Sequence, residues 1–128
     1  MRRLMTSALL LGASAGHAAT PAELLERWQS ESRVTASAAA GNRFFHQVHG
    51  DWSCATCHTA DPLARGRHAI TGKGIAPLAP AADPARFTDL GRADKWFKRN
   101  CGDVIGRDCT PAEKADVLAW LMSLKPVR

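Results

Sequence analysis

The sequence contains no apolar run long enough to cross a lipid bilayer. Its most apolar segment, Leu4 to Ala15, is well short of the roughly 20 residues that a spanning helix needs. No segment shows sustained alternation of β-branched and aromatic residues, which disfavours a sheet. A phosphate-binding glycine loop is missing, and the histidines and carboxylates show no spacing that suggests hydrolysis. These absences favour a helical protein without a membrane span, a nucleotide site or a hydrolytic site.

The first residues have the three parts of a secretory signal. Two arginines form a basic start, an apolar segment follows, and Gly16-His17-Ala18-Ala19 supplies small residues at the end. Cleavage after Ala18 fits the small-residue pattern better than cleavage after Ala19. We therefore expect a signal peptide over residues 1–18 and one exported domain over residues 19–128, delivered to the periplasm.

The charge excess is small. Seventeen basic and 12 acidic residues give a net charge of +5, and removing Arg2 and Arg3 with the signal peptide lowers it to +3. So modest an excess does not indicate nucleic-acid binding. Five basic side chains gather in one segment: Arg92, Lys95, Lys98, Arg99 and Arg107. They form either a solvated helix face or a surface that steers an acidic redox partner.

Capping signals and helical spacing predict an all-α domain. Helices are expected over about 20–32 and 37–48, from near Asp94 to Gly102, and from Thr110 to Pro126. Gly102 is the expected terminator of the third of these helices. Between residues 59 and 85, four prolines and three glycines rule out a long helix, so this segment should be either an ordered wrap or a loop.

The motif Cys54-Ala55-Thr56-Cys57-His58 carries the chemistry. Two thiols separated by two residues can add to the vinyl groups of haem, while the following imidazole reaches the iron as proximal ligand. The motif therefore predicts one covalent haem c. Two alternatives stay open: a disulfide or dithiol role for the pair, and a zinc site completed by Cys101 and Cys109.

The sixth position of the iron decides the function. A second strong ligand favours electron transfer, whereas a weak or absent ligand permits small molecules to bind. Met122 is the only methionine after the signal peptide, and it falls where a helical core residue is expected. The other candidates are histidines: His46, His49 and His68. A carbonyl in the segment 77–80 is an expected acceptor for the free ring N–H of His58.

Nearly the whole chain after the signal peptide resembles one family. Residues 52–62 (WSCATCHTADP), 72–80 (GKGIAPLAP) and 96–101 (WFKRNC), followed by Cys109, are similar to the sphaeroides haem protein family. Its members are small cytochromes similar to class I cytochromes c. The resemblance implies the class I fold, in which N- and C-terminal helices cross around a covalent haem, with Gly41 at the close contact.

The resemblance also implies the ligand set. Asn100 matches the asparagine that ligates oxidised iron in that family and leaves on reduction, after which a diatomic ligand such as dioxygen or nitric oxide binds. The competing interpretation is that Asn100 caps a helix before Gly102. A Cys101–Cys109 disulfide is implied as well, and the even number of cysteines in an exported chain supports it.

The resemblance further implies a redox partner such as a dihaem cytochrome c. No residue outside the iron site looks catalytic, although an open haem iron permits weak oxygen reduction or peroxidase turnover. A monomer is expected. The alternative function is plain electron transfer with two strong axial ligands, Met122 or a histidine completing the iron.

Overall fold

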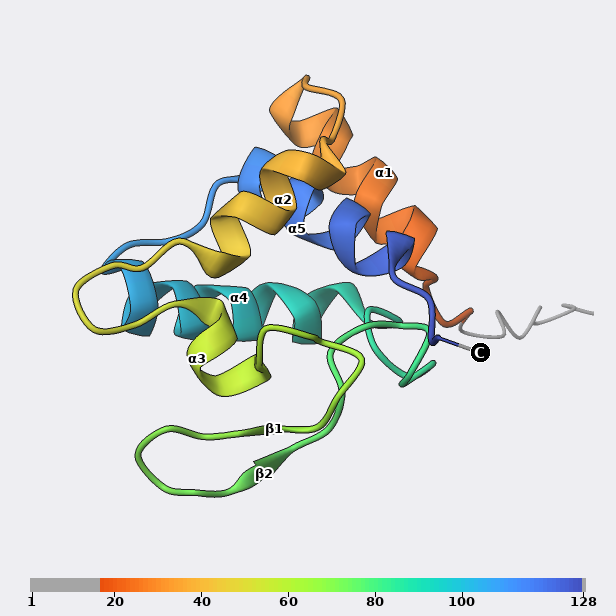
Figure 1. Cartoon of the computed structure of the whole chain (residues 1–128). Coiled ribbons are helices and arrows are strands. Elements are labelled where there is room, and N and C mark those ends of the chain that lie inside the picture. Colours follow the sequence, from red (N-terminus) through yellow and green to blue (C-terminus); the bar gives the residue numbers. More distant parts are fainter. Residues whose placement is uncertain (1–16, 128) are drawn as a thin grey trace, which may run out of the picture.

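The computed structural model describes residues 17–127, so the predicted signal peptide lies almost entirely outside the described residues (Figure 1). The elements in chain order are α1 (Pro21–Ser32), α2 (Ala38–His46), α3 (Cys54–His58), β1 (Gly66–Arg67), β2 (Gly74–Ile75), α4 (Leu90–Ile105) and α5 (Pro111–Ser123). The all-α prediction is confirmed, since the two strands form only a two-residue antiparallel ladder. Among the described residues, no helix combines the length and the apolar character that a membrane span requires.

Two helices begin with the capping arrangement that the sequence predicts. Glu23 N–H donates to Thr20 Oγ1 at 3.2 Å, and Thr20 N–H donates to a Glu23 carboxylate oxygen at 2.7 Å. Thr110 and Glu113 repeat the reciprocal pair at 3.2 and 2.8 Å before α5. These bonds satisfy amides that a helix start otherwise leaves unpaired.

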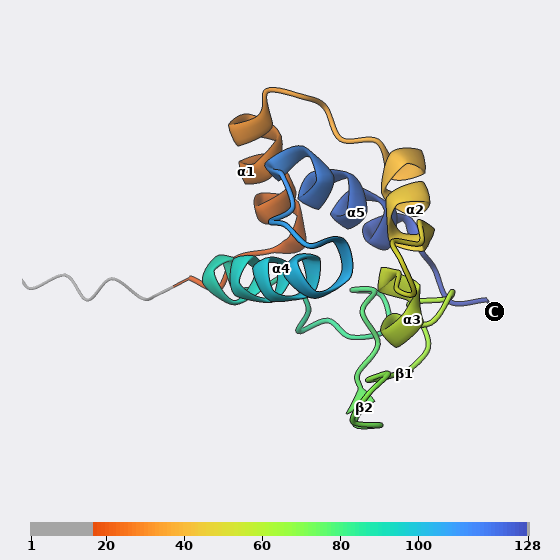
Figure 2. The same ribbon diagram turned by 90° about the vertical axis from the view of Figure 1, so that its left-hand side faces the viewer.

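The helix α5 lies at the centre of the scaffold, with α1 on one side and α2 on the other (Figure 2). A Cβ at Gly41 of α2 would lie 1.9 Å from the backbone oxygen of Asp116 in α5, so the two helices meet backbone to backbone. The ring centroids of Phe45 and Trp120 are 4.9 Å apart beside this crossing. The crossed pair implied by the family resemblance is therefore formed by α2 and α5, and α1 precedes it.

Two apolar clusters fill the scaffold on either side of α5. The first contains Trp28 and Leu118, both fully buried, and Trp28 meets the Phe97 ring of α4 edge to face with centroids 5.4 Å apart. The second contains Phe45, Val117, Trp120 and Leu121. A single helix thus contributes to both clusters, which explains why α5 is apolar around most of its circumference.

The predicted ends of α4 are wrong. The helix begins earlier, at Leu90, after the Asp89 side chain accepts the Arg92 N–H at 2.9 Å, and it continues through Gly102 to Ile105. It ends at Gly106, whose φ of 73° is the left-handed conformation that terminates many helices. Asn100 therefore lies inside the helix, and the helix-cap interpretation of Asn100 is wrong.

The proline-rich segment after α3 is an ordered wrap. The backbone N–H groups of Leu78 and Ala79 both donate to the Pro62 carbonyl, at 3.0 and 3.1 Å. At Gly66 a Cβ would come within 2.2 Å of the Cys57 carbonyl oxygen, so β1 presses directly on α3. The wrap thus contacts the turn that carries the sequence motif.

Candidate haem site

The helix α3 is a single turn that begins directly at the first cysteine of the motif. Ser53 N–H donates to Thr56 Oγ1 at 2.9 Å, and Thr56 N–H donates to the Ser53 carbonyl at 3.1 Å. Side chains three residues apart share a helix face. Cys54 and Cys57 therefore present both thiols on one side, and His58 follows at the end of the turn.

The two thiols of α3 are unpaired, and the environment of Cys54 does not favour a thiolate. Neither forms a disulfide, and the Ala69 N–H donates to Cys57 Sγ at 3.4 Å. Burial raises the pKa of the Cys54 thiol to about 11. A thiol with so high a pKa stays neutral near pH 7, unlike the cysteine of a reactive dithiol.

The four-cysteine zinc site is excluded by the disulfide. Cys101 and Cys109 are bonded to each other, with their Cα atoms 5.7 Å apart, so neither is available as a thiolate ligand. The described part of the chain contains no group of three or more histidine, cysteine, aspartate or glutamate side chains that could hold a metal ion.

The imidazole of His58 is held neutral. Burial, with a smaller contribution from the positive charge of Arg86, lowers the pKa of His58 to about 4. The ring is half-buried, and its centroid lies 6.3 Å from that of Phe45. A neutral imidazole has a nitrogen lone pair free for a metal, which is what a proximal ligand needs.

Asn100 is an exposed residue of α4. Its side-chain amide has no hydrogen-bond partner among the described residues, and both views show α3 beside the C-terminal half of α4 (Figures 1 and 2). Trp96, one turn earlier on the same face, is 48% exposed. The guanidinium of Arg99 lies 5.5 Å from the Trp96 ring centroid.

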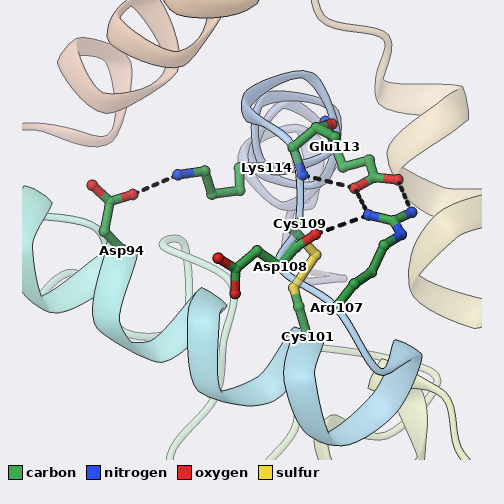
Figure 3. The surroundings of a disulfide bond; sticks show 8 residues. Asp94, Cys101, Arg107, Asp108, Cys109, Glu113 and Lys114 are labelled. Atoms are coloured by element: carbon green, nitrogen blue, oxygen red, sulfur yellow. Dashed lines mark hydrogen bonds and ion pairs between the residues drawn. A yellow bond between two sulfur atoms is a disulfide. The ribbon is translucent and has the colours of Figure 1, made fainter.

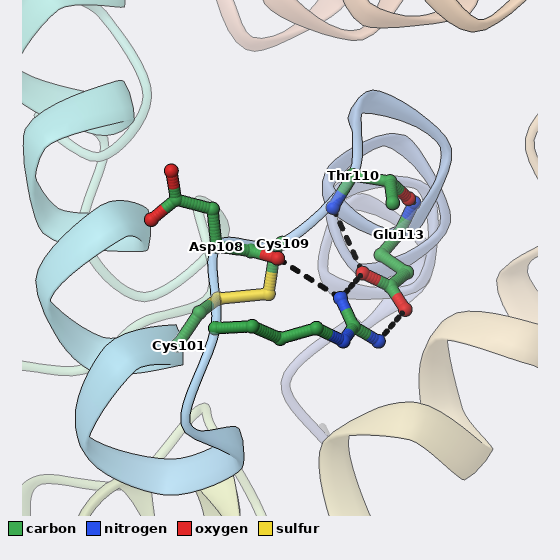
Figure 4. Close-up of polar contacts among 6 residues, drawn as sticks. Cys101, Asp108, Cys109, Thr110 and Glu113 are labelled. Carbon is green, nitrogen blue, oxygen red and sulfur yellow. Dashed lines mark hydrogen bonds and ion pairs between the residues drawn. A yellow bond between two sulfur atoms is a disulfide. The ribbon is translucent and has the colours of Figure 1, made fainter.

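The disulfide ties the helix of Asn100 to the start of α5. Figure 3 shows Cys101 of α4 joined to Cys109, which directly precedes the Thr110 cap. Arg107 forms a two-pronged ion pair with Glu113, with donor–acceptor distances of 2.9 and 2.7 Å (Figure 3). Figure 4 shows the same Glu113 carboxylate accepting the Thr110 N–H of the helix cap. The backbone immediately after Asn100 is thereby fixed.

Known proteins share both this sequence and this fold. A family model described as a domain of unknown function (DUF1924) matches residues 31–121. The cytochrome c-type protein SHP of Cereibacter sphaeroides is 46% identical over 125 residues, which cover 94% of this chain and 96% of that protein. The solved structure of oxidised SHP, described as an oxygen-binding cytochrome c, matches with a TM-score of 0.78 at 47% identity and covers 85% of this chain and all of that one.

A more distant relative has the same architecture. The solution structure of Methylophilus methylotrophus cytochrome c'' matches with a TM-score of 0.75 at 32% identity, over 84% of this chain and 97% of that one. The chain belongs to the sphaeroides haem protein family. It is a monohaem cytochrome, and its cofactor is covalently bound haem c.

The residues of this cytochrome fit that cofactor. The turn α3 offers two unpaired thiols on one face and a neutral imidazole at its end. In the preceding loop, Nε2 of His49 is buried and has no hydrogen-bond partner within residues 17–127. Buried polar atoms almost always have a partner, so this nitrogen indicates a group that the polypeptide itself does not supply.

The other sixth-ligand candidates are differently placed. Met122 packs against the cluster of Trp28 and Leu118, away from the cluster that Cys54 contacts. Both ring nitrogens of His46 contact carbonyl oxygens, at 2.9 and 3.1 Å. Nδ1 of His68 accepts two backbone N–H groups, at 3.3 and 3.1 Å. Of these three histidines, only His49 has a buried ring nitrogen without a hydrogen-bond partner in the described residues.

One residue of the site was missed in the sequence. Arg86 donates from Nε to the Pro77 carbonyl at 2.9 Å and from Nη2 to the Ala76 carbonyl at 2.8 Å. The Pro77 carbonyl was among the acceptors expected for His58. No local pattern marks Arg86, because its partners lie nine and ten residues away in an irregular segment.

Proposed function

We propose that this cytochrome holds its haem through thioether bonds to Cys54 and Cys57, with His58 as proximal ligand and Asn100 as sixth ligand of the oxidised iron. Reduction releases Asn100 and opens the sixth position to a diatomic ligand such as dioxygen or nitric oxide. The iron supplies a one-electron redox centre and a binding position for that ligand.

The free amide of Asn100 is the observation that carries the proposal. It lies on the helix beside α3, and no described residue satisfies its oxygen. A neutral amide oxygen is a hard and weak ligand, which suits ferric iron better than ferrous iron. Because the Cys101–Cys109 disulfide fixes the adjacent backbone, the side chain can leave and return by rotating about its own bonds.

The relatives support a ligand that detaches. SHP is described as an oxygen-binding cytochrome c, and the solution structure of cytochrome c'' concerns haem-ligand detachment. Both share the fold of this chain at 47% and 32% identity.

The test compares absorption spectra of the oxidised and reduced holoprotein with and without carbon monoxide. Carbon monoxide should shift the reduced spectrum and leave the oxidised one unchanged. Asn100→Ala should change the oxidised spectrum, whereas Asn42→Ala, an exposed asparagine on α2, should not. A reduced spectrum unmoved by carbon monoxide, together with an unchanged Asn100→Ala spectrum, would remove the proposal.

A second candidate is plain electron transfer with His49 as a strong sixth ligand. The buried, unpartnered Nε2 of His49 is the observation that favours it. His49→Gln would then change both the oxidised and the reduced spectrum and make the reduced protein bind carbon monoxide. Under the Asn100 proposal, the same substitution leaves the axial ligation unchanged.

We further propose a periplasmic location and an acidic redox partner, such as a dihaem cytochrome c. Export follows from the predicted signal peptide, and the disulfide suits an oxidising compartment. Four cations on α4 are exposed and stand outside the four ion pairs found in the described residues: Arg92, Lys95, Lys98 and Arg99. Such a face attracts an acidic surface, and the rate of encounter falls with salt.

Electron transfer from a purified acidic donor should therefore slow as ionic strength rises. Lys95→Glu combined with Lys98→Glu should slow it further, whereas Lys125→Glu, an exposed lysine beyond α5, should have a smaller effect. Equal effects of the two changes would contradict docking on α4.

Cell fractionation tests the proposed periplasmic location, which is wrong if the haem protein stays in the cytoplasm.

A further inference from the structure

Arg86 is a half-buried cation in the wrap that follows β2. Its two backbone hydrogen bonds, to Pro77 at 2.9 Å and to Ala76 at 2.8 Å, are both partly shielded from water. Its nearest anion is Asp83, with Nε 3.5 Å from a carboxylate oxygen. Both side chains of this pair are less than a third exposed. An arginine held by carbonyls at such a place keeps its charge in one position.

The segment that Arg86 holds is continuous with the contacts on α3. Ala76 directly follows β2, which pairs with β1, and Gly66 of β1 abuts the backbone of Cys57 and His58. Gly66 is paired with Ile75 in this ladder, so the Ala76 carbonyl that the guanidinium holds is one residue away from the strand pair that abuts His58. Arg86 is therefore linked to the backbone that carries His58, and its charge is fixed on that side of the site.

We propose that Arg86 is a positioning residue that raises the reduction potential of the haem iron. It does so through its fixed positive charge and through its hydrogen bonds to the Ala76 and Pro77 carbonyls. This inference rests on the proposed role of His58 as proximal ligand. It assigns to Arg86 a function that neither the motif nor the fold requires.

The direction follows from charge alone. Oxidised iron carries one more positive charge than reduced iron, so a nearby cation destabilises the oxidised form and raises the potential. Partial burial preserves the effect, because screening by water and salt is weaker there than at an exposed site. Reduction adds one electron from the donor protein, and in this proposal a higher potential favours the state in which Asn100 is released.

The test measures the midpoint potential of holoprotein variants by spectroelectrochemical titration. Arg86→Gln keeps an N–H donor for one carbonyl but removes the charge, and it should lower the potential. Asp83→Asn removes the opposing charge while its Oδ1 still accepts the Ala85 N–H, now 3.1 Å away, so it should raise the potential. Arg86→Lys should give a smaller decrease than Arg86→Gln.

The matched control is Arg27→Gln, which removes the same charge from an exposed ion pair on α1. It should leave the potential close to that of the unmodified protein. Circular dichroism and thermal unfolding establish that each variant is folded. If Arg86→Gln yields no holoprotein, the midpoint potentials of Arg86→Lys and Asp83→Asn still test the role of Arg86, because the first should fall and the second should rise.

Equal potentials for Arg86→Gln and Arg27→Gln, or a potential lowered by Asp83→Asn, would overturn the inference. The two proposals fail in different ways. A spectrum without a His58-ligated haem would refute the proposed function, whereas a normal spectrum with unshifted potentials would refute only the role of Arg86.

Discussion

The scaffold of α1, α2 and α5 and the haem-holding segments α3, 59–89 and α4 are held together by different means. In the scaffold, large side chains such as Trp28, Phe45 and Leu118 are almost fully buried against one another. In the haem-holding segments, Ile70 is 79% exposed and Trp96 is 48% exposed, while polar links to backbone carbonyls hold the wrap. The scaffold therefore supplies most of the apolar packing, and in our proposal the other segments surround the cofactor.

Substitutions in the two regions should therefore change different properties of the protein. Substitutions in the scaffold should lower the free energy of unfolding and leave the absorption spectrum unchanged. Substitutions around the haem should change the spectrum or the potential at a small cost in stability.

Leu118→Ala should have the largest effect on stability. Leu118 is fully buried in the cluster with Trp28, so truncation removes apolar contacts and leaves a cavity costing about 3 kcal/mol. Denaturant unfolding of the holoprotein measures the loss, with Ile70→Ala as the exposed control. An altered haem spectrum in folded Leu118→Ala would break the separation of the two regions.

Gly41→Ala should destabilise by about 2 kcal/mol, because its Cβ would overlap the backbone oxygen of Asp116. Gly102→Ala is the matched control, since a Cβ there meets nothing within 4 Å. Alanine in a helix interior is favoured over glycine, so this control should stabilise by about 0.5 kcal/mol or more. Thermal unfolding should show shifts of opposite sign, and shifts of the same sign would contradict the close crossing of α2 and α5.

Removing the disulfide should affect both regions, because Cys101 lies next to Asn100 while Cys109 leads into α5. Cys101→Ser with Cys109→Ser should cost about 2 kcal/mol through the freed chain. The oxidised spectrum should also change, since Asn100 loses its fixed position. A loss of stability with an unaltered oxidised spectrum would show that the disulfide stabilises the scaffold but does not position Asn100.

Glu113→Gln should have the smallest effect on the free energy of unfolding, and the size of this effect should depend on pH. The hydrogen bond from Arg107 is the main cause that lowers the pKa of Glu113 below its ordinary value. A carboxylate with a lowered folded-state pKa adds stability above its unfolded pKa and loses it as pH falls through the folded value. Unfolding midpoints measured between neutral and acidic pH should fall less steeply for Glu113→Gln than for the unmodified protein, and parallel curves would exclude this contribution.

Local signals predicted much of the fold. Thr20 and Thr110 each precede a proline and a glutamate at capping spacing, and both helices start there. The C-terminal end of α4 was missed because Gly102 looks like a terminator locally, whereas the helix continues to Gly106, past the cysteine that the disulfide anchors. Tertiary contacts of this kind override local propensity.

The part of the candidate site that is formed by residues close together in the sequence could be predicted. The spacing of Cys54, Cys57 and His58 is a property of one helical turn, and the sequence reveals it directly. Asn100 could be proposed only through the family resemblance, since an exposed asparagine has no distinctive spacing. Arg86 required coordinates, because it acts through carbonyls far along the chain. His49 was a candidate by sequence, and coordinates were needed to distinguish it from His46 and His68 by its buried, unpartnered Nε2.

The most direct test is the mass of the peptide that contains residues 54–58, isolated after denaturing protein matured in a cell competent for haem attachment. This peptide should carry one haem group bonded through both cysteines, with no thiol left to react with an alkylating reagent. A peptide of unmodified mass, with two thiols that alkylate freely, would contradict it.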